Sequence, residues 1–323
     1  MTVPEERGGA RLDHVLAELL PAAVGEPVSR GKARKLILAG AVYLDRKRVR
    51  VASRSVHARG SIEVVFDPQK WEEGRASATL APVDIGDERV IYEDADLIVV
   101  DKPPGLPTQP TVDQARDHLF GAVKRRLGGP NSYVGLHHRL DVDTSGLVLF
   151  TKTKAANPGV ARLFAEHALR KTYFALALRP REGARAEWTV KNHLGRLPGP
   201  KKPSRFGAVR AGGDVAETHF KRIQDFPDRG LVLVEARPVT GRTHQIRVHL
   251  SEGGMPILGD RLYGGDGGHG GGAGGYAGAR PAGGPIPRLM LHAGRLEFKH
   301  PLTGKDMVIE APLPADFRAA LGG

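Results

Sequence analysis

The chain has 323 residues, enough for two domains or for one domain with an appendage. It carries 48 Lys and Arg against 36 Asp and Glu, a net charge of +12, and the complete lack of cysteine excludes disulfides, thiolate zinc sites, iron–sulfur clusters and cysteine nucleophiles. The sequence shows no secretory signal pattern and no membrane-length apolar run, so we expect a cytoplasmic protein with a polyanionic partner.

The first predicted elements form a small module with a mixed helix and strand pattern. A first amphipathic helix is indicated by apolar residues at helical spacing, namely Leu12, Val15, Leu16 and Leu19. A second helix is expected to begin after Ser29, which suits the N-cap, and to end at Gly40, which suits a left-handed C-terminal position. An alternating hairpin at 42–49 and a strand at 61–65 complete this α+β module.

Most of the positive charge lies in this module. Between Val28 and Gly60 there are ten basic residues and one acidic residue, so the stretch carries 10 − 1 = +9. A solvated charged face is the alternative interpretation, but we favour a surface that follows nucleic-acid phosphates without reading bases. The candidate RNA-binding residues are Arg30, Lys32, Arg34, Lys35, Arg46, Lys47 and Arg48.

The rest of the chain predicts a linker and one larger domain. Residues 69–87 are rich in charge, Ala and Pro and are expected to form a linker. Residues 88–315 alternate strand-like runs with helical segments at 113–127 and 155–167, which predicts an α+β domain on a mixed, largely antiparallel sheet. Within it, residues 264–284 contain 12 glycines and almost no apolar residues, so we expect a flexible surface loop.

Two polar segments of the larger domain carry the candidate chemistry. The segment HHRLDVDTSGL at 137–147 presents a carboxylate in a loop before a strand-like run. The segment RPVTGRTHQIRVHL at 237–250 fits a strand or a helix, because its polar residues satisfy either periodicity.

Other site chemistries remain as alternatives at this point. A hydrolase could combine Ser145, His244 and Asp141, but the G-x-S-x-G pattern around such a serine is missing. A zinc site could use histidines whose spacing differs from HExxH, namely His137, His138, His244 and His249. A non-catalytic RNA-binding or ribosome-assembly factor could use the basic module alone.

Six segments in order resemble one enzyme family. HRLDVDTSGL, RKTYFALAL, RPVTGRTHQIRVHL and GMPILGDRLYG, with VVDKPPGL before them and PRLMLHAGRLEFKHP after them, are similar to the RluA-type pseudouridine synthases over residues 88–315. Residues 10–68 resemble the alpha-L RNA-binding module. Where such modules turn on Asn-Gly, this chain has Asp45-Arg46, and because Arg is unfavourable at positive φ we expect a longer or different turn.

The resemblance implies an isomerisation of uridine to pseudouridine in ribosomal RNA, or alternatively in transfer RNA, by an enzyme that needs no cofactor and no metal. Asp141 matches the family's essential carboxylate, while Tyr173 and Arg247 match its active-site tyrosine and arginine. A guanidinium beside a carboxylate favours the ionised form. Three roles for Asp141 stay open: attack on the sugar, attack on the base, or abstraction of a sugar proton.

The resemblance also implies residues that hold the substrate. Arg139 matches the arginine that enters the space left by the flipped nucleotide, and Leu291 would close one side of the uracil pocket. We interpret Asp143 as shaping the loop rather than as catalytic. A base must leave its stack before it can react, at a cost of a few kcal/mol. A monomer is the default expectation.

Overall fold

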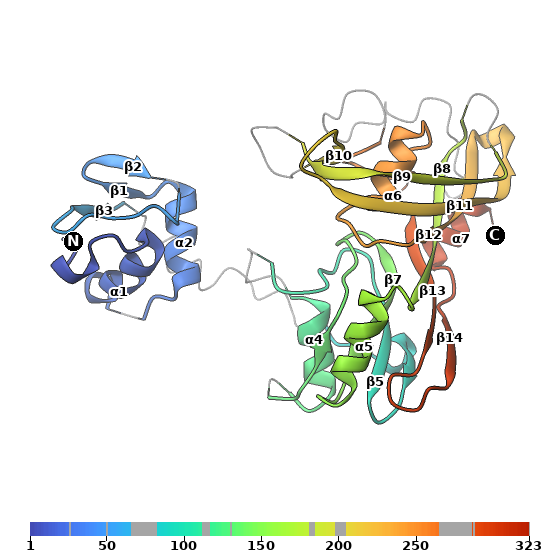
Figure 1. The fold of residues 1–323 in the computed structure, drawn as a ribbon, viewed down its shortest axis with the longest axis horizontal. Helices are drawn as coiled ribbons and strands as arrows, with labels where there is room; N and C mark the ends of the chain where they lie inside the picture. The colour runs from blue at the N-terminus through green and yellow to red at the C-terminus, as the bar shows by residue number, and fades with distance from the viewer. Residues whose placement is uncertain are drawn as a thin grey trace. The chain divides into compact units, whose positions relative to one another are not determined.

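The computed structural model separates into two compact units, residues 1–78 and 79–323 (Figure 1). Most of the expected linker at 69–87 and of the expected Gly-rich loop at 264–284 lies outside the residues that the structure describes. Every helix in the described part of the chain is too short or too polar to span a lipid bilayer. The described residues are 1–25, 27–49, 51–65, 83–111, 117–129, 131–180, 185–197, 205–264, 286 and 288–322.

The first unit packs two α-helices on a three-stranded antiparallel sheet of order β2-β1-β3. Ser29 caps the second helix as expected, because its Oγ accepts a hydrogen bond of 3.2 Å from the amide of Lys32, and Gly40 ends that helix with φ 77°. The elements are η1 (Glu5–Arg7), α1 (Leu12–Val24), α2 (Arg30–Ala39), β1 (Val42–Leu44), β2 (Lys47–Val49) and β3 (Ile62–Val64).

The turn between β1 and β2 corrects one expectation. Leu44 pairs directly with Lys47, so only Asp45 and Arg46 form the turn, and their φ angles are 48° and 63°. The prediction of a longer or different turn is therefore wrong, because two residues at positive φ form the tight hairpin turn that Asn-Gly usually supplies. A tertiary contact holds it: the amide of Ser61 donates to Asp45 Oδ1 and the amide of Asp45 to the carbonyl of Ser61, each at 2.8 Å.

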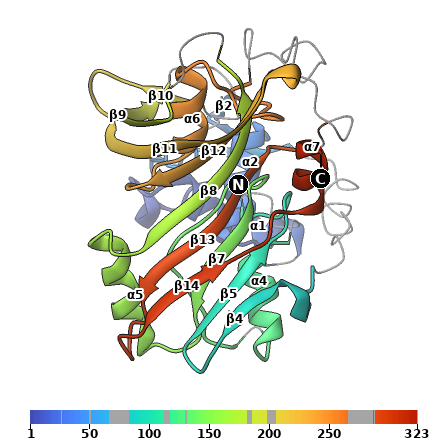
Figure 2. The same ribbon diagram turned by 90° about the vertical axis from the view of Figure 1, so that its right-hand side faces the viewer.

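The second unit is built on one 11-stranded sheet with the main order β10-β9-β11-β12-β8-β13-β7-β5-β4, and Figure 2 shows its central strands side by side. Strand β14 pairs with β13, β6 pairs with β7, and the β13–β7 pair is parallel whereas the other described pairs are antiparallel. The α+β class with a mixed, largely antiparallel sheet is confirmed. The strands are β4 (Val90–Glu93), β5 (Leu97–Lys102), β6 (Gly135–Leu136), β7 (Ser145–Thr151), β8 (Arg170–Leu178), β9 (Glu187–Arg196), β10 (Phe206–Ala208), β11 (Asp214–Phe226), β12 (Leu231–Pro238), β13 (Leu291–Lys299) and β14 (Asp306–Glu310).

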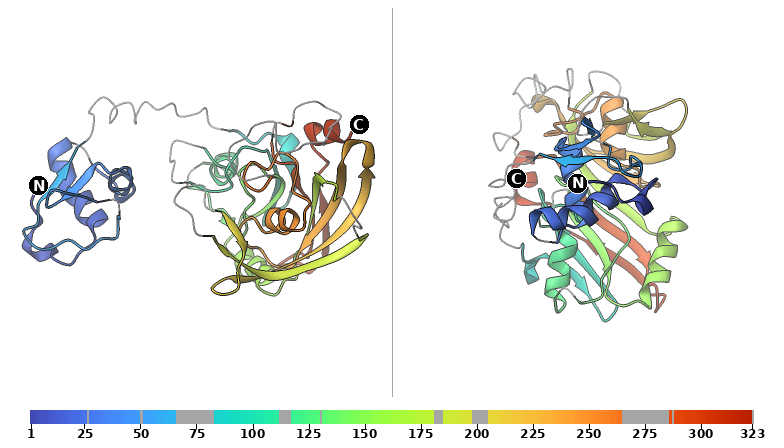
Figure 3. Two further views of the ribbon diagram at one scale, coloured as in Figure 1. Left: turned by 90° about the horizontal axis from the view of Figure 1, so that it is seen from above. Right: turned by 90° about the vertical axis from the view of Figure 1, so that its left-hand side faces the viewer.

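Helices cover both faces of this sheet, which explains the continuous apolar runs in β5 and β7. Val100 and Phe150 pack in the core that includes α4, whereas their neighbours Val99 and Leu149 pack in the core that includes α5. From above, the orange segment that contains α6 lies inside the curve of the yellow strands (Figure 3). The remaining helices are η2 (Asp87–Arg89), α4 (Leu119–Arg126), α5 (Ala156–Ala165), η3 (Pro227–Arg229), α6 (Gln245–Glu252) and α7 (Ala315–Leu321).

One glycine allows two central strands to approach each other closely. Gly146 in β7 has φ 115°, and a Cβ added there would overlap the backbone of Ala293 in β13. Glycine is required at this position for both its backbone conformation and its lack of a side chain. The close approach joins the strand that follows the Asp141 loop to the strand that begins at Leu291.

Candidate active site

A cavity of about 470 Å³ in the second unit brings together the site residues predicted for this domain. It is formed by the loop before β7, by β8, by the loop between β12 and α6, and by the start of β13. Its lining includes Asp141, Tyr173, Arg247, Arg139 and Leu291. These side chains come from four separate parts of the sequence, so their convergence is a product of the fold.

The loop that carries Asp141 is clamped on both sides of the carboxylate. Before it, the Leu140 amide donates to Thr108 Oγ1 at 3.1 Å, and that hydroxyl donates back to the Leu140 carbonyl at 2.9 Å. After it, the Val142 carbonyl accepts from Lys102 Nζ at 2.9 Å and from the Gly105 amide at 2.8 Å. The position of Asp141 therefore depends on the segment that follows β5.

Arg247 holds the carboxylate from the other side of the cavity. Its Nη1 donates to Asp141 Oδ2 at 2.9 Å, while Nε and Nη2 donate to the two oxygens of Asp260 at 2.8 and 2.9 Å. The side chain of Asp260 is 0% exposed. Burial alone would lower the pKa of Arg247, but the carboxylates of Asp260 and Asp141 raise it above its usual value. The guanidinium is thus a fixed positive charge with a planar geometry matched to Asp260.

The segment that supplies Arg247 is a helix, which decides between the two periodicities of the sequence. Strand β12 ends at Pro238 and α6 begins at Gln245. The Gln245 carboxamide accepts from Thr240 Oγ1 and from the Arg242 amide at 2.7 and 3.0 Å, and it donates to β11 through Thr218 Oγ1 at 2.8 Å. This buried amide shapes the connecting loop and docks the start of α6 on the sheet.

His244 is a component of the site that the sequence pointed to only through rejected chemistries. It precedes α6 with φ 58°, a left-handed conformation that is uncommon for a residue with a side chain. Its Nδ1 lies 2.8 Å from Tyr263 Oη, and its Nε2 lies 3.8 Å from Asp141 Oδ2. Burial, only partly opposed by the charge of Asp141, lowers the pKa of His244. This shift favours the neutral imidazole beside the carboxylate.

Tyr173 and Leu291 form the wall of the cavity on adjacent strands. Tyr173 in β8 lies between Ala236 of β12 and Ala293 of β13, and Leu291 pairs with Ala175 on the same face of β8 as Tyr173. Burial, and then the charge of Asp141, raises the pKa of Tyr173 above its ordinary value. The phenol therefore keeps its proton at neutral pH and presents a ring and a hydroxyl beside the carboxylate.

Arg139 is exposed at the rim, where its Nη2 donates to Thr243 Oγ1 at 3.3 Å. A long, exposed guanidinium at the mouth of the cavity is placed to contact a substrate as it enters. Asp143, from the same loop, is exposed as well. Unlike Asp141, Asp143 does not line the cavity.

Sequence reasoning missed Lys102 and Asp260 as site residues. Lys102 is 0% exposed, and its Nζ donates to the carbonyls of Pro103, Leu106 and Val142 at 2.8–2.9 Å. A signal for each was present, because a lysine ends the apolar run LIVVDK and an aspartate ends the GMPILGD segment. The local sequence of neither segment identifies the distant residue with which its charged side chain interacts.

The geometry does not assemble the alternative sites. Ser145 Oγ lies 3.0 Å from His292 Nδ1, so it is not paired with His244 as a hydrolase would require. The four histidines of the zinc alternative bond to different neighbours, for example His249 to Thr218 and Asn192 at 3.0 Å, and the Leu149 amide to His138. In the described part of the chain no three metal-ligating side chains cluster.

The basic residues of the first unit lie on its surface. Arg30 and Arg34 of α2 are exposed, as are Arg46, Lys47 and Arg48 in and after the β1–β2 turn. Lys32 is partly buried, and the side chain of Lys35 lies outside the described residues. These positions give the unit an exposed basic hairpin beside a basic helix.

Comparison with known proteins assigns the family. The RNA pseudouridylate synthase family matches residues 96–252. Ribosomal large subunit pseudouridine synthase C of Vibrio vulnificus is 32% identical over 318 residues, covering 96% of this chain and 91% of the relative. Synthase D of Yersinia pestis is 33% identical and covers 98% of this chain and 91% of the relative.

The chain belongs to the RNA pseudouridine synthase family.

Solved structures of two human proteins share the fold of this chain. Human RNA pseudouridylate synthase domain containing 1 has a TM-score of 0.54 at 25% identity, covering 71% of this chain and 86% of that one. Human RNA pseudouridylate synthase domain containing 4 has a TM-score of 0.57 at 23% identity, covering 78% and 97%, and shows the shared fold.

RNA pseudouridine synthases isomerise uridine to pseudouridine within an RNA chain. The resemblance seen in the sequence, the activity as an isomerase and the RNA substrate are thereby confirmed.

Proposed function

We propose that this pseudouridine synthase modifies uridines of large-subunit ribosomal RNA and that Asp141 is its essential carboxylate. The essential role of Asp141 is supported by its hydrogen bond from Arg247, which Asp260 holds from the other side and which fixes the Asp141 carboxylate at the wall of a cavity beside Tyr173. The names of relatives that match nearly the whole chain support the first part, because they act on the ribosomal large subunit. Transfer RNA is the competing substrate.

The reaction needs few groups from the protein. The bond between N1 of uracil and C1′ of the ribose breaks, the base rotates, and C5 bonds to C1′. The hydrogen on C5 then leaves as a proton, and N1 gains one. All three routes open to Asp141, attack on the sugar, attack on the base, or removal of a sugar proton, use its ionised form, which Arg247 stabilises.

The other cavity residues have complementary roles in this proposal. Leu291 and the ring of Tyr173 enclose the uracil once it has left its stack. The Tyr173 hydroxyl lies beside the reacting base and acts as a proton relay, accepting the C5 proton as it passes its own proton to a neighbouring acceptor such as the Asp141 carboxylate. Arg139 at the rim occupies the space that the base leaves.

The assignment of substrate is tested with unmodified transcripts. Purified protein is incubated with large-subunit ribosomal RNA and, separately, with transfer RNA, each labelled with tritium at C5 of uracil. We expect tritium release from the ribosomal RNA alone, with carbodiimide-dependent reverse-transcription stops at specific uridines. Release from transfer RNA alone would overturn the proposed substrate, and release from neither would overturn the proposed activity.

The Tyr173→Phe variant is expected to bind RNA normally and to turn over more slowly. The substitution keeps the ring that packs beside Leu291 and removes only the hydroxyl, so the loss should be about 10²- to 10⁴-fold in kcat, the size of a general acid–base contribution. Single-turnover tritium release measures it, with Phe174→Tyr on the opposite face of β8 as a control for altered aromatic content. Unchanged turnover would limit Tyr173 to stacking.

The basic hairpin of the first unit is expected to supply affinity and not chemistry. Replacing Arg46, Lys47 and Arg48 together by Gln removes three exposed charges. Each phosphate that is no longer neutralised should reduce the log–log salt slope of binding by about 0.7–0.9, while kcat at saturating RNA stays unchanged. Filter binding across a salt series measures the slope, and Arg59→Gln, whose guanidinium pairs with Glu5 at 2.6 Å, is the control. An unchanged slope would mean that this hairpin is only a solvated face.

A further inference from the structure

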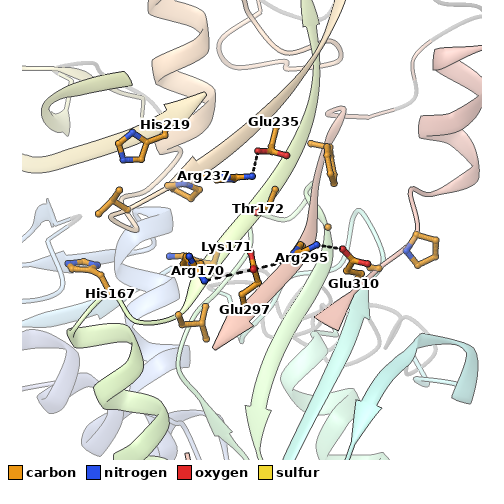
Figure 4. Close-up of a pocket in the computed structure, with 17 residues that line it drawn as sticks. His167, Arg170, Lys171, Thr172, His219, Glu235, Arg237, Arg295, Glu297 and Glu310 are labelled. Carbon is orange, nitrogen blue, oxygen red and sulfur yellow. Dashed lines mark hydrogen bonds and ion pairs between the residues drawn. The ribbon is translucent and has the colours of Figure 1, made fainter. Parts of the chain in front are cut away.

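Lys171 is a basic residue that lines the active-site cavity but has no role in the proposed reaction. It lies in β8 two residues before Tyr173, and because strand side chains alternate, both point to the same face of the sheet. It lines the cavity that contains Asp141, and it also lines a second cavity of about 740 Å³ (Figure 4). Lys171 thus lies where the two cavities adjoin.

The other cations of the second cavity are neutralised by carboxylates. Figure 4 shows Arg237 paired with Glu235 at 2.8 Å and Arg295 paired with Glu310 at 2.6 Å. Arg295 also pairs with Glu297 at 3.2 Å. This cavity has its own balanced charges, and its carboxylates would repel a phosphate placed among them.

Lys171 has no such partner within the described residues. No ion pair or hydrogen bond joins its ammonium to them, and Nζ lies 5.8 Å from the ring centroid of Phe164. Nζ also lies 3.9 Å from the position that a Cβ on Gly241 would take, which places it against the loop between β12 and α6. Burial without a compensating carboxylate lowers the pKa of Lys171.

A partly buried ammonium without a counter-ion is unfavourable in the free protein. An anionic group that enters the cavity would be attracted to it, and the low polarity of its surroundings would strengthen that attraction. The anion that accompanies every nucleotide of an RNA substrate is its phosphodiester. The charge on Lys171 is therefore unpaired in the free enzyme and complementary to the substrate.

We propose that Lys171 binds a phosphodiester that adjoins the target uridine when the base is flipped into the cavity. This inference rests on the proposed function and adds a substrate-binding residue to the same site. The contact holds the backbone of the flipped nucleotide on β8, two residues from Tyr173, and so fixes the uridine relative to Asp141. Arg139 then fills the space that the flipped base leaves in the RNA stack, whereas Lys171 binds the backbone of the flipped nucleotide.

The test uses a short RNA centred on a uridine that the ribosomal RNA mapping identifies. Three versions of the RNA are compared: unmodified, and with a neutral methylphosphonate at the linkage 5′ or 3′ to that uridine. They are assayed with the wild-type enzyme and with Lys171→Met, which has similar length and no charge. Lys171→Arg tests rescue by charge, and Arg170→Met, on the opposite face of β8 and exposed, is the matched control.

On unmodified RNA, Lys171→Met is expected to raise KM about 10- to 100-fold, the size expected for removing a charge-assisted hydrogen bond, with kcat within about threefold of wild type. Lys171→Arg should recover most of the affinity, and Arg170→Met should leave KM unchanged. With the wild-type enzyme, one of the two methylphosphonates should weaken binding by a similar factor. With Lys171→Met, that same methylphosphonate should have little further effect.

Two results would overturn the proposal. One is a methylphosphonate penalty that is equally large in wild-type and Lys171→Met enzyme at both linkages. The other is a Lys171→Met variant, folded by its thermal unfolding curve, with unchanged KM. Failure of the proposed function is distinguished by which RNA the wild-type enzyme turns over: if only transfer RNA reacts, the proposed substrate is wrong, and the same comparison of variants and linkages on a short RNA around the transfer RNA target still decides the role of Lys171.

Discussion

The Asp141→Asn variant is expected to lose isomerase activity by at least about 10⁴-fold while it binds RNA almost as well as the wild type. The amide has the size of the carboxylate but lacks the negative charge that each of the three routes uses. Arg247 would stay in place, because its hydrogen bonds of 2.8 and 2.9 Å to Asp260 do not involve Asp141. Tritium release under single-turnover conditions and filter binding measure the two effects separately.

A matched control for this variant lies two residues along the same loop. Asp143→Asn removes the same charge from an exposed position and should keep activity within a few fold of the wild type. A decisive contradiction would be an Asp141→Asn enzyme that retains about a tenth of wild-type turnover, since loss of an essential nucleophile or base costs far more. Equal losses in both variants would show that loop structure, not the carboxylate, had been disturbed.

The Arg247→Lys variant is expected to lose about 10²-fold or more in kcat although the charge is retained. A lysine has no planar fork, so it does not reproduce two hydrogen bonds to Asp260 and a third, of 2.9 Å, to Asp141. Asp260 would then be a buried carboxylate with weaker compensation, and the thermal midpoint of unfolding should fall as well. Steady-state kinetics and thermal unfolding measure the two consequences.

A double-mutant cycle tests whether Asp260 affects turnover by positioning Arg247 or independently of it. If Asp260 acts through Arg247, the effects of Arg247→Lys and Asp260→Asn on kcat should be strongly non-additive, because either substitution breaks the same contact. Additive effects would mean that the two residues influence turnover independently. A full kcat in Arg247→Lys would show that a positive charge near Asp141 is sufficient and that the fork geometry has no role.

Local features of the fold were predictable because they depend on neighbours in the sequence. Ser29 and Gly40 bound α2 as expected, since capping involves groups within one helical turn. Strand-like runs expected within residues 88–315 include those that form β5 and β7, whose β-branched and aromatic residues suit buried strands. The order of six family-like segments was enough to identify the enzyme class before any contact was known.

Sequence patterns were therefore sufficient for the fold class, the family and the three candidate residues Asp141, Tyr173 and Arg247, whereas their contacts follow from the tertiary fold. The tertiary structure shows that residues 245–252 form a helix, whose buried first residue Gln245 docks on β11. It also placed Lys102 under the Asp141 loop and Asp260 behind Arg247. The physical reason is range: periodicity and capping act over a few residues, whereas a buried charge is stabilised by partners that the fold brings from distant segments.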